Sequence, residues 1–195
     1  MTNATTKRTN DETTRPARLV VVTGFMGAGK TTVARALSRR LSCTFVDLDQ
    51  HVTEREGRTP QAIIDEDGEA LFRDAETRAL EEIIETTNIA AFINRPLVVA
   101  LGGGTWTLER NRALVEAARA LVVWLDAPFE LCWRRIRNAR TNAPDRPLAR
   151  DPESARALYA RRRDAYALAS LRVEVSEHRS AEDLASEIAA AARCC

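Results

Sequence analysis

Short apolar runs alternate along the chain with longer segments in which apolar residues recur every three or four positions. The first run, RLVVVT at 18–23, is a β-branched stretch of the kind that forms strands buried on both faces. Similar runs predict further strands at 44–46, 97–101, 121–125 and 172–176. Helical spacing predicts helices at 30–41, from 60 onward, and at 69–86, 108–118, 128–137, 152–168 and 181–193. The helix at 69–86 is expected to bury Leu71, Phe72, Leu80, Ile83 and Ile84.

This alternation of strands and helices predicts an α/β fold in three layers. Parallel strands need right-handed crossovers, so helices should cover both faces of a parallel sheet. Ligands of such sheets bind at the carboxyl ends of the strands. Here these ends carry a glycine-rich segment at 24–31, the pair Asp47 and Asp49, three glycines at 102–104, and Asp126. Three of these four are chemically distinctive, and they are predicted to converge on one edge.

The glycine-rich segment, GFMGAGKT, matches the pattern G-x-x-x-x-G-K-[ST], with a predicted strand before it and a predicted helix after it. Glycines let backbone N–H groups curl around an anion, and a helix N-terminus adds partial positive charge. Lys30 should then reach the β- and γ-phosphates of a nucleoside triphosphate, expected to be ATP, and the Thr31 hydroxyl should ligate Mg²⁺. The alternative, a glycine-rich turn with a chance Lys-Thr pair, leaves the flanking strand and helix unexplained.

Carboxylates and further glycines follow the next predicted strands. Asp47 can hold a water bound to Mg²⁺ while Asp49 faces an acceptor hydroxyl as its orienter or general base. A helix cap is the alternative role for one of the two. Gly102, Gly103 and Gly104 directly follow a buried run, and their steric freedom allows the backbone to approach a ligand closely. A plain tight turn, the other interpretation, needs only one or two glycines.

Composition restricts the class of protein. The 195 residues, of which 45% are hydrophobic, fit one folded domain at 18–195 that follows a disordered tail at 1–17. The 29 basic and 28 acidic residues argue against bulk electrostatic binding to nucleic acid or membrane. No apolar run approaches the roughly 18 residues of a membrane span. Four cysteines without metal-ligand spacing, and no signal peptide, indicate reduced thiols in a cytoplasmic protein.

The chain contains many arginines, so candidate functional arginines are identified by their positions in the sequence. Arg73 precedes Glu76 by three residues on a predicted helix, so the carboxylate can hold the guanidinium in place, although such pairs are commonly plain surface contacts. Arg146 lies in a proline-containing segment at 139–151, which predicts a mobile loop. Arg162 lies on the helix that follows this loop.

Taken in order, these features resemble the shikimate kinase family over roughly residues 18–192. The matching pieces are GFMGAGKTT (24–32), D-x-D (47–49), DGEALFRDAE (67–76), LGGG (101–104), RPL (146–148) and R-x-x-x-Y (162–166). The glycine motif alone is shared by many nucleotide-binding enzymes, whereas the ordered combination is much more specific. The resemblance implies a three-layer α/β/α P-loop kinase fold with a five-stranded parallel sheet and a mobile lid. It also implies a monomer that transfers the γ-phosphate of ATP to the 3-hydroxyl of shikimate in aromatic amino-acid biosynthesis.

The resemblance further implies roles for single residues. Asp49 and Gly103 would bind substrate hydroxyls, and two arginines would grip the substrate carboxylate in bidentate fashion. The implied substrate-binding set is Asp49, Arg73, Gly102, Gly103, Gly104 and Arg162. The implied ATP-binding set is Gly27, Ala28, Gly29, Lys30, Thr31, Thr32, Arg140, Arg146, His178 and Arg179.

Within these sets, the implied catalytic residues are Lys30, Asp49 and Arg146. Arg146 would enter from the lid at 139–151 and stabilise the transferring phosphoryl group as an arginine finger. Arg140 would lie over the adenine, and the turn at His178 and Arg179 would form the other side of the base pocket.

Several positions depart from the family pattern without removing a charge that the chemistry needs. Thr53 replaces an acidic residue, Ile64 replaces a common Phe beside the substrate, and Thr105-Trp106 replaces two small residues. The lid reads RPLA in place of RPLL. Ile64 and Trp106 can reshape the acceptor pocket, so phosphorylation of gluconate or another hydroxylated acid stays open. An inactive nucleotide-binding module is the third hypothesis, although the intact charged residues argue against it.

Overall fold

Five parallel strands and the helices between them form the fold that the sequence predicts. The computed structural model describes residues 17–90, 96–140 and 151–193. The elements follow in the order β1 (Leu19–Thr23), α1 (Lys30–Leu41), β2 (Thr44–Asp47), α2 (Leu48–Glu56), α3 (Pro60–Asp67), α4 (Glu69–Ala90), β3 (Leu97–Ala100), the 3₁₀ turn η2 (Thr105–Thr107), α5 (Glu109–Ala117), β4 (Leu121–Asp126), α6 (Phe129–Arg140), α7 (Pro152–Tyr166), β5 (Leu171–Glu174) and α8 (Ala181–Ala192).

The sheet places the strand that precedes the glycine-rich segment at its centre. The strand order is β2-β3-β1-β4-β5, and every pairing is parallel. Within it, Val21 of β1 lies opposite Val99 of β3 on one side and Val122 of β4 on the other. The three inner strands are buried along their whole length, as expected of continuous apolar runs covered on both faces. Segment 24–31 therefore leaves from the middle of the sheet edge.

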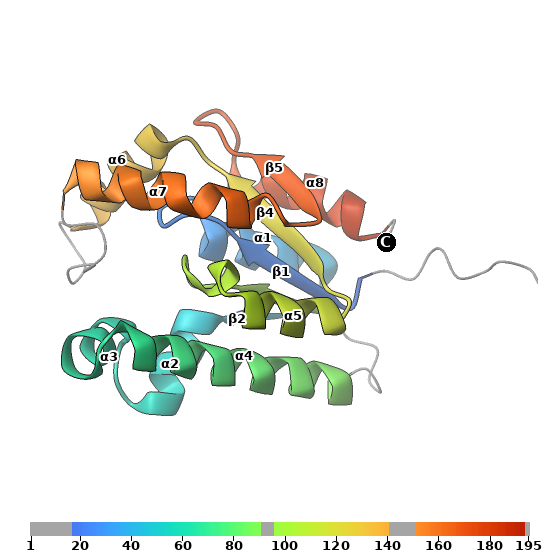
Figure 1. Cartoon of the computed structure of the whole chain (residues 1–195). Coiled ribbons are helices and arrows are strands. Elements are labelled where there is room, and N and C mark those ends of the chain that lie inside the picture. The colour runs from blue at the N-terminus through green and yellow to red at the C-terminus, as the bar shows by residue number, and fades with distance from the viewer. Residues whose placement is uncertain (1–16, 91–95, 141–150, 194–195) are drawn as a thin grey trace, which may run out of the picture.

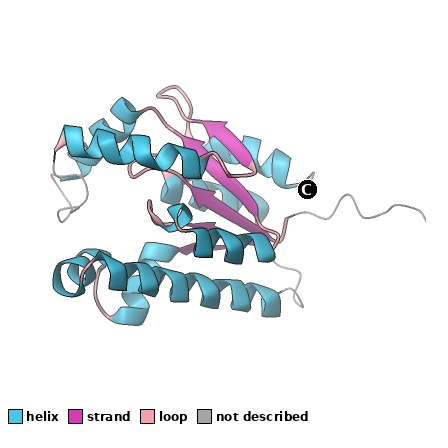
Figure 2. Cartoon of the chain, in the orientation of Figure 1, coloured by secondary structure: helices cyan, strands magenta, loops and turns pink. Residues whose placement is uncertain are grey.

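Helices cover both faces of the sheet. α1 and α8 pack against each other on one face, while α5 and α7 lie over the other (Figure 1). α2, α3 and α4 pack together beyond the β2 edge, in the lower part of the view. Figure 2 shows the strands enclosed between these helices, which confirms the predicted three layers. In the described part of the chain, no helix is long and apolar enough to cross a membrane.

Local signals fix where most of the helices begin. Asp47, Thr59, Asp151 and Ser180 each accept a hydrogen bond from a first-turn N–H group, at α2, α3, α7 and α8 respectively. α1 begins differently, after Gly29 with φ 98°, and no side chain of the described residues caps it. The first-turn N–H groups of a helix have no partner within the helix, so those of α1 are suited to bind a ligand.

The structure also corrects the sequence prediction in places. The sequence pattern did not predict α2, which begins directly after Asp47, and several helices end a few residues away from their predicted ends. The predicted burial of Leu71 was wrong, because this residue is 54% exposed whereas Phe72 is buried. Neighbouring residues on a helix point about 100° apart, and of these two it is Phe72 that faces the core. Residues 1–16 of the tail and the greater part of the predicted lid, with Arg146, lie outside the described residues.

Packing between α8 and α1 provides a test of the core. Ile188 of α8 is completely buried, so Ile188→Ala removes buried methyl groups and leaves a cavity. We expect the free energy of unfolding to fall by about 2–5 kcal/mol, measured by urea denaturation. The matched control is Leu168→Ala, because Leu168 is 63% exposed and its truncation should change stability by less than about 0.5 kcal/mol. Equal effects of the two variants would contradict the packing described.

Candidate active site

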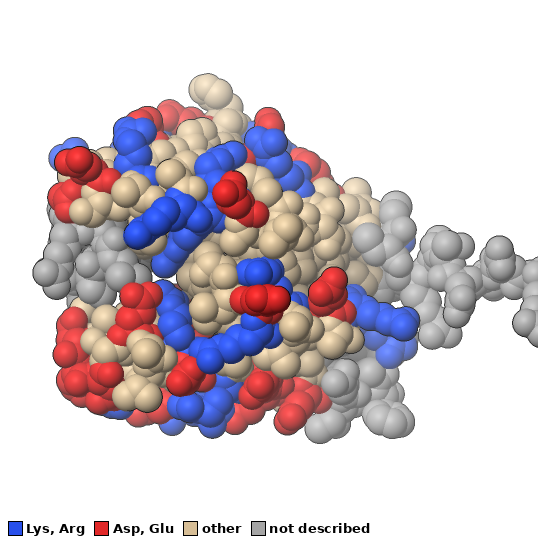
Figure 3. Space-filling model, in the orientation of Figure 1, with Lys and Arg blue, Asp and Glu red and all other residues tan. Residues whose placement is uncertain are grey.

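The carboxyl ends of the strands meet at one cavity of about 600 Å³, a volume typical of small-molecule sites. It brings together most of the residues that the sequence singled out. Those lining it are Gly27, Gly29, Lys30, Thr31, Thr32, Asp47, Asp49, Arg73, Gly102, Gly103, Gly104 and Arg162. Figure 3 shows Lys and Arg side chains above and below a depression between the upper and lower helices. Basic side chains around a cavity favour an anionic ligand.

The glycine-rich segment 24–31 packs tightly against β4 and α6. A Cβ atom on Gly24 would lie 2.7 Å from the carbonyl oxygen of Leu125, and one on Gly27 would lie 2.6 Å from that of Cys132. Both glycines also have positive φ angles, 142° and 79°, which other residues adopt only with strain. Backbone contact therefore fixes the course of this segment, and glycine is required at both positions.

Two cations are bound to carbonyl oxygens of the same segment. Lys30 Nζ donates to the carbonyl oxygen of Phe25 at 3.2 Å. Arg135 of α6 donates to those of Gly27 and Ala28 at 3.2 and 3.3 Å. Arg135 also lines the cavity, but the sequence did not predict this, because Arg135 lies in an arginine-rich helix and belongs to no recognisable motif. The two cations concentrate positive charge at the segment, which favours a phosphate there.

An oxygen pair lies at the start of α1. The Thr31 hydroxyl donates to Asp47 Oδ2 at 2.7 Å. The other carboxylate oxygen of Asp47 accepts from the backbone N–H groups of Asp49 and Gln50, at 3.1 and 3.4 Å. Asp47 therefore caps α2, the alternative that the sequence left open for one of the two aspartates, and contacts Thr31 with its second oxygen.

Across the cavity, Arg73 of α4 lies between two carboxylates. Its Nη1 donates to Glu76 Oε2 at 2.5 Å, and its Nη2 donates to Glu69 Oε1 at 2.7 Å. Glu76 is completely buried, so the pair predicted from the sequence is a buried one. Burial acts to lower the pKa of Arg73, but the charges and hydrogen bonds of Glu76 and Glu69 outweigh it and raise the pKa. Arg73 therefore stays charged.

The triple-glycine turn lies directly against these side chains. A Cβ atom on Gly102 would lie 2.4 Å from Glu76 Oε1 and 2.7 Å from Asp49 Oδ1. One on Gly104 would lie 2.6 Å from Arg73 Nη2. Even a methyl group at either position would displace a charged side chain of the cavity. The turn therefore lets three charged groups pack against bare backbone.

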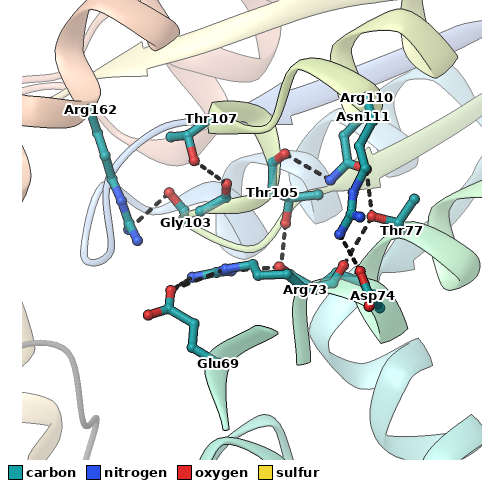
Figure 4. A network of polar contacts seen from close by, with 12 residues as sticks. Glu69, Arg73, Asp74, Thr77, Gly103, Thr105, Thr107, Arg110, Asn111 and Arg162 are labelled. Carbon is teal, nitrogen blue, oxygen red and sulfur yellow. Dashed lines mark hydrogen bonds and ion pairs between the residues drawn. The ribbon is translucent and has the colours of Figure 1, made fainter. Parts of the chain in front are cut away.

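Arg162 of α7 approaches the same turn from the opposite side (Figure 4). Its Nη1 donates to the carbonyl oxygen of Gly103 at 3.1 Å, and the Tyr166 hydroxyl donates to that oxygen at 2.5 Å. Burial lowers the pKa of Arg162; Tyr166 partly opposes this, and the positive charge of Arg73 adds to it. The same burial raises the pKa of Tyr166 to about 12. Two guanidinium groups that repel each other across one turn form a suitable site for a carboxylate.

Other predicted residues are absent from the lining of the cavity or lie outside the described part of the chain. Arg179 donates to the carbonyl oxygen of Glu174 at 2.8 Å and pairs with Glu187, and neither it nor His178 is among the lining residues. The side chain of Arg140 and the whole of Arg146 lie outside the described residues.

Ile64 and Trp106, the two residues that depart from the family pattern and were expected to shape the acceptor pocket, lie in different places. Ile64 lines the cavity. Trp106 is buried and absent from the lining, and its indole N–H donates to the carbonyl oxygen of Ala165 at 2.9 Å. Trp106 therefore ties the turn to α7, and Ile64 is the departure that can touch an acceptor.

The site has the features of a P-loop phosphotransferase. These are a glycine loop at a helix N-terminus, a Thr–Asp oxygen pair and two arginines that face one cavity. The family model described as Shikimate kinase matches residues 26–193. The shikimate kinase of Geobacter sulfurreducens is 40% identical over 175 residues, which are 88% of this chain and 89% of the relative. That of Ruegeria pomeroyi is 36% identical, with 89% and 84% covered. The chain belongs to the shikimate kinase family.

Solved structures agree with this assignment. The shikimate kinase from Acinetobacter baumannii in complex with shikimate superposes with a TM-score of 0.76 at 32% identity and covers 88% of this chain and 90% of that one. A gluconokinase from Sinorhizobium meliloti superposes with a TM-score of 0.56 at 17% identity, covering 91% and 93%. The second likeness extends to the fold alone.

The close packing of Gly27 gives a test of the phosphate site. Gly27→Ala should weaken ATP binding by more than tenfold, about 1.4 kcal/mol, because its Cβ would push the segment away from Cys132. Calorimetric titration with a non-hydrolysable ATP analogue measures the effect. The control is Gly57→Ala, since Gly57 also has a positive φ, 67°, but nothing lies within 4 Å of its Cβ position. An unchanged affinity in Gly27→Ala would mean that the loop does not bind the phosphates.

Proposed function

We propose that this protein phosphorylates the 3-hydroxyl of shikimate with ATP. The observation that supports it best is the convergence of Arg73 and Arg162 on the glycine turn, in the same cavity as the phosphate loop. A ring acid whose carboxylate lies between these arginines could present a hydroxyl toward Asp49, which lines the cavity as well. Shikimate carries this combination of groups, and it is the acid in the complex of the Acinetobacter baumannii relative.

The proposed chemistry asks for positioning and charge neutralisation more than for covalent work. The loop amides and Lys30 hold the triphosphate, and Arg73 and Arg162 align the acceptor. The 3-hydroxyl oxygen forms a bond to the γ-phosphorus while the bond from that phosphorus to the β,γ-bridging oxygen breaks, giving ADP. Asp49 orients the hydroxyl and accepts its proton.

Mg²⁺ fits the oxygen pair at the start of α1. Within the described segments, no group of three or more His, Cys, Asp or Glu could hold a metal ion. Mg²⁺ in nucleotide sites needs no such group, since it keeps several waters and takes one or two protein oxygens besides the phosphates. We infer that the Thr31 hydroxyl ligates the ion and that Asp47 holds one of its waters. The ion would neutralise charge on the phosphates.

The remaining ATP contacts are proposed on family resemblance. Arg146 would act as the arginine finger, and Arg140 would lie over the adenine; the structure does not describe these side chains. His178 and Arg179 would complete the base pocket. Gly27, Ala28, Gly29 and Thr32 belong to or directly follow the loop and would contact the phosphates.

Phosphorylation of another hydroxylated acid is the competing function. An arginine pair would bind the carboxylate of gluconate or quinate as well, and Ile64 changes one wall of the cavity. The difference of a methylene-sized contact is worth only about 1–3 kcal/mol, so this wall alone does not decide the acceptor.

An acceptor panel separates these functions. ADP release is measured by a coupled assay with ATP and Mg²⁺ against shikimate, gluconate and quinate. We expect kcat/KM for shikimate to exceed that for the other two by more than about a hundredfold, because a site that pairs with specific hydroxyls can discriminate by as much as about 10⁴–10⁵. Turnover of gluconate alone would refute the proposed acceptor, and turnover of none would refute the kinase activity.

The Mg²⁺ site gives a separate prediction. Asp47→Asn keeps a side chain that caps helices as well as Asp does, but it removes the negative charge beside Thr31. The Mg²⁺ concentration for half-maximal turnover should therefore rise by about tenfold or more, while thermal stability stays near that of the wild type. The control is Thr59→Asn, which makes the same kind of cap exchange at α3. An unchanged Mg²⁺ requirement in Asp47→Asn would exclude Asp47 from the metal site.

A further inference from the structure

A buried polar network connects the acceptor side of the cavity to α5 (Figure 4). Its central group is the carboxylate of Glu76, which is completely buried. Arg73 donates to Oε2 of this carboxylate at 2.5 Å, and the hydroxyl of Thr105 donates to Oε1 at 2.5 Å. The two oxygens are thus satisfied by different elements, one by α4 itself and the other by the turn after the three glycines.

Thr105 is in turn held rigidly. It is completely buried, as is Asn111 of α5, whose Nδ2 donates to the Thr105 carbonyl oxygen at 2.9 Å. The Thr77 hydroxyl of α4 donates to Asn111 Oδ1 at 2.8 Å. The contacts therefore form a closed path from Glu76 through the turn and α5 back to α4. A fully satisfied buried network of this kind fixes the positions of its members.

The network determines how the hydrogen bonds of Arg73 are divided between Glu76 and Glu69. Arg73 uses Nη1 on Glu76 and its Nε and Nη2 on Glu69, whose side chain is half exposed. A carboxylate and a guanidinium prefer to pair through two parallel hydrogen bonds. Glu76 makes a single bond to Arg73, and its other oxygen accepts the hydrogen bond from Thr105. The bond from Thr105 fixes the carboxylate in an orientation that offers one oxygen to Arg73, while Nε and Nη2 of the guanidinium stay on Glu69.

We propose that Thr105 is a positioning residue, which holds Glu76 so that Arg73 remains turned toward the carboxylate of the acceptor. This inference rests on the proposed function for the identity of that carboxylate. It assigns a role to a residue that the sequence marked only as a departure from the family pattern.

The substitution that isolates the hydroxyl is Thr105→Val, which keeps the shape of the side chain. We expect the KM for shikimate to rise by about tenfold, because Glu76 then pairs with Arg73 through both oxygens. The kcat and the KM for ATP should change by less than twofold. Thr105→Ser restores the hydroxyl and should return the KM for shikimate to within about threefold of the wild type.

A matched control lies two residues away in the same turn. The Thr107 hydroxyl donates to the carbonyl oxygen of Gly104 at 2.6 Å, whereas Glu76 and Arg73 bond to other groups. Thr107→Val therefore removes a hydrogen bond of the turn without touching the network. If it raises the KM for shikimate as much as Thr105→Val does, general loosening of the turn explains the effect and the proposal is overturned.

A double-mutant cycle tests whether Thr105 acts through Arg73. In an Arg73→Met background, Thr105→Val should produce no further rise in the KM for shikimate, since the guanidinium that it positions is absent. The methyl ester of shikimate, whose carboxylate charge is removed, should show equal KM values with the wild type and Thr105→Val. Additive effects in the cycle, or an equal loss on the ester, would contradict the proposal.

A ligand-free crystal structure of Thr105→Val separates this inference from the proposed function. We expect Arg73 to have turned onto Glu76 with two parallel hydrogen bonds, whatever acid the enzyme accepts. That result supports the positioning role even if the acceptor panel rejects shikimate. An unmoved Arg73 in a folded variant would overturn it, even if shikimate is the substrate.

Discussion

Backbone contact between the glycine loop and its neighbours is the constraint on which the whole site depends. Gly24 and Gly27 lie so close to carbonyl oxygens of β4 and α6 that no other residue fits. The loop can therefore end in only one way, at the uncapped start of α1, where helix N–H groups favour an anion. Because β1 is the central strand, the loop lies at the middle of the sheet edge.

On the side of the cavity formed by Arg73 and Arg162, positive charges are balanced by groups of the protein itself. Arg73 and Arg162 face one turn, and their mutual repulsion is tolerated because Glu76 and Glu69 pair with the first and a carbonyl oxygen binds the second. Burial of Glu76 makes its partners obligatory, since an unpaired buried carboxylate is very costly. The turn of three glycines thus lets Glu76, Asp49 and Arg73 lie against its bare backbone.

The sequence predicted the strands, the phosphate loop and most of the lining residues, because continuous apolar runs and the glycine motif are local signals. It missed α2, although a helix cap was the alternative role for one of the two aspartates, because no helix was predicted between the strand at 44–46 and residue 60. It placed Leu71 inside, because periodicity cannot decide between adjacent apolar residues. Arg135 and the bond from Thr105 to Glu76 join segments far apart in the chain. No local pattern reports such contacts, and only the fold brings them together.

A crystal structure with ADP and shikimate bound together tests the central claim most directly. The account predicts that the β-phosphate contacts backbone N–H groups at 27–31 and that the shikimate carboxylate lies between Arg73 and Arg162. It further predicts the 3-hydroxyl beside Asp49, on the side of the cavity that faces the phosphates. Phosphates bound elsewhere, or a carboxylate that contacts neither arginine, would contradict the account.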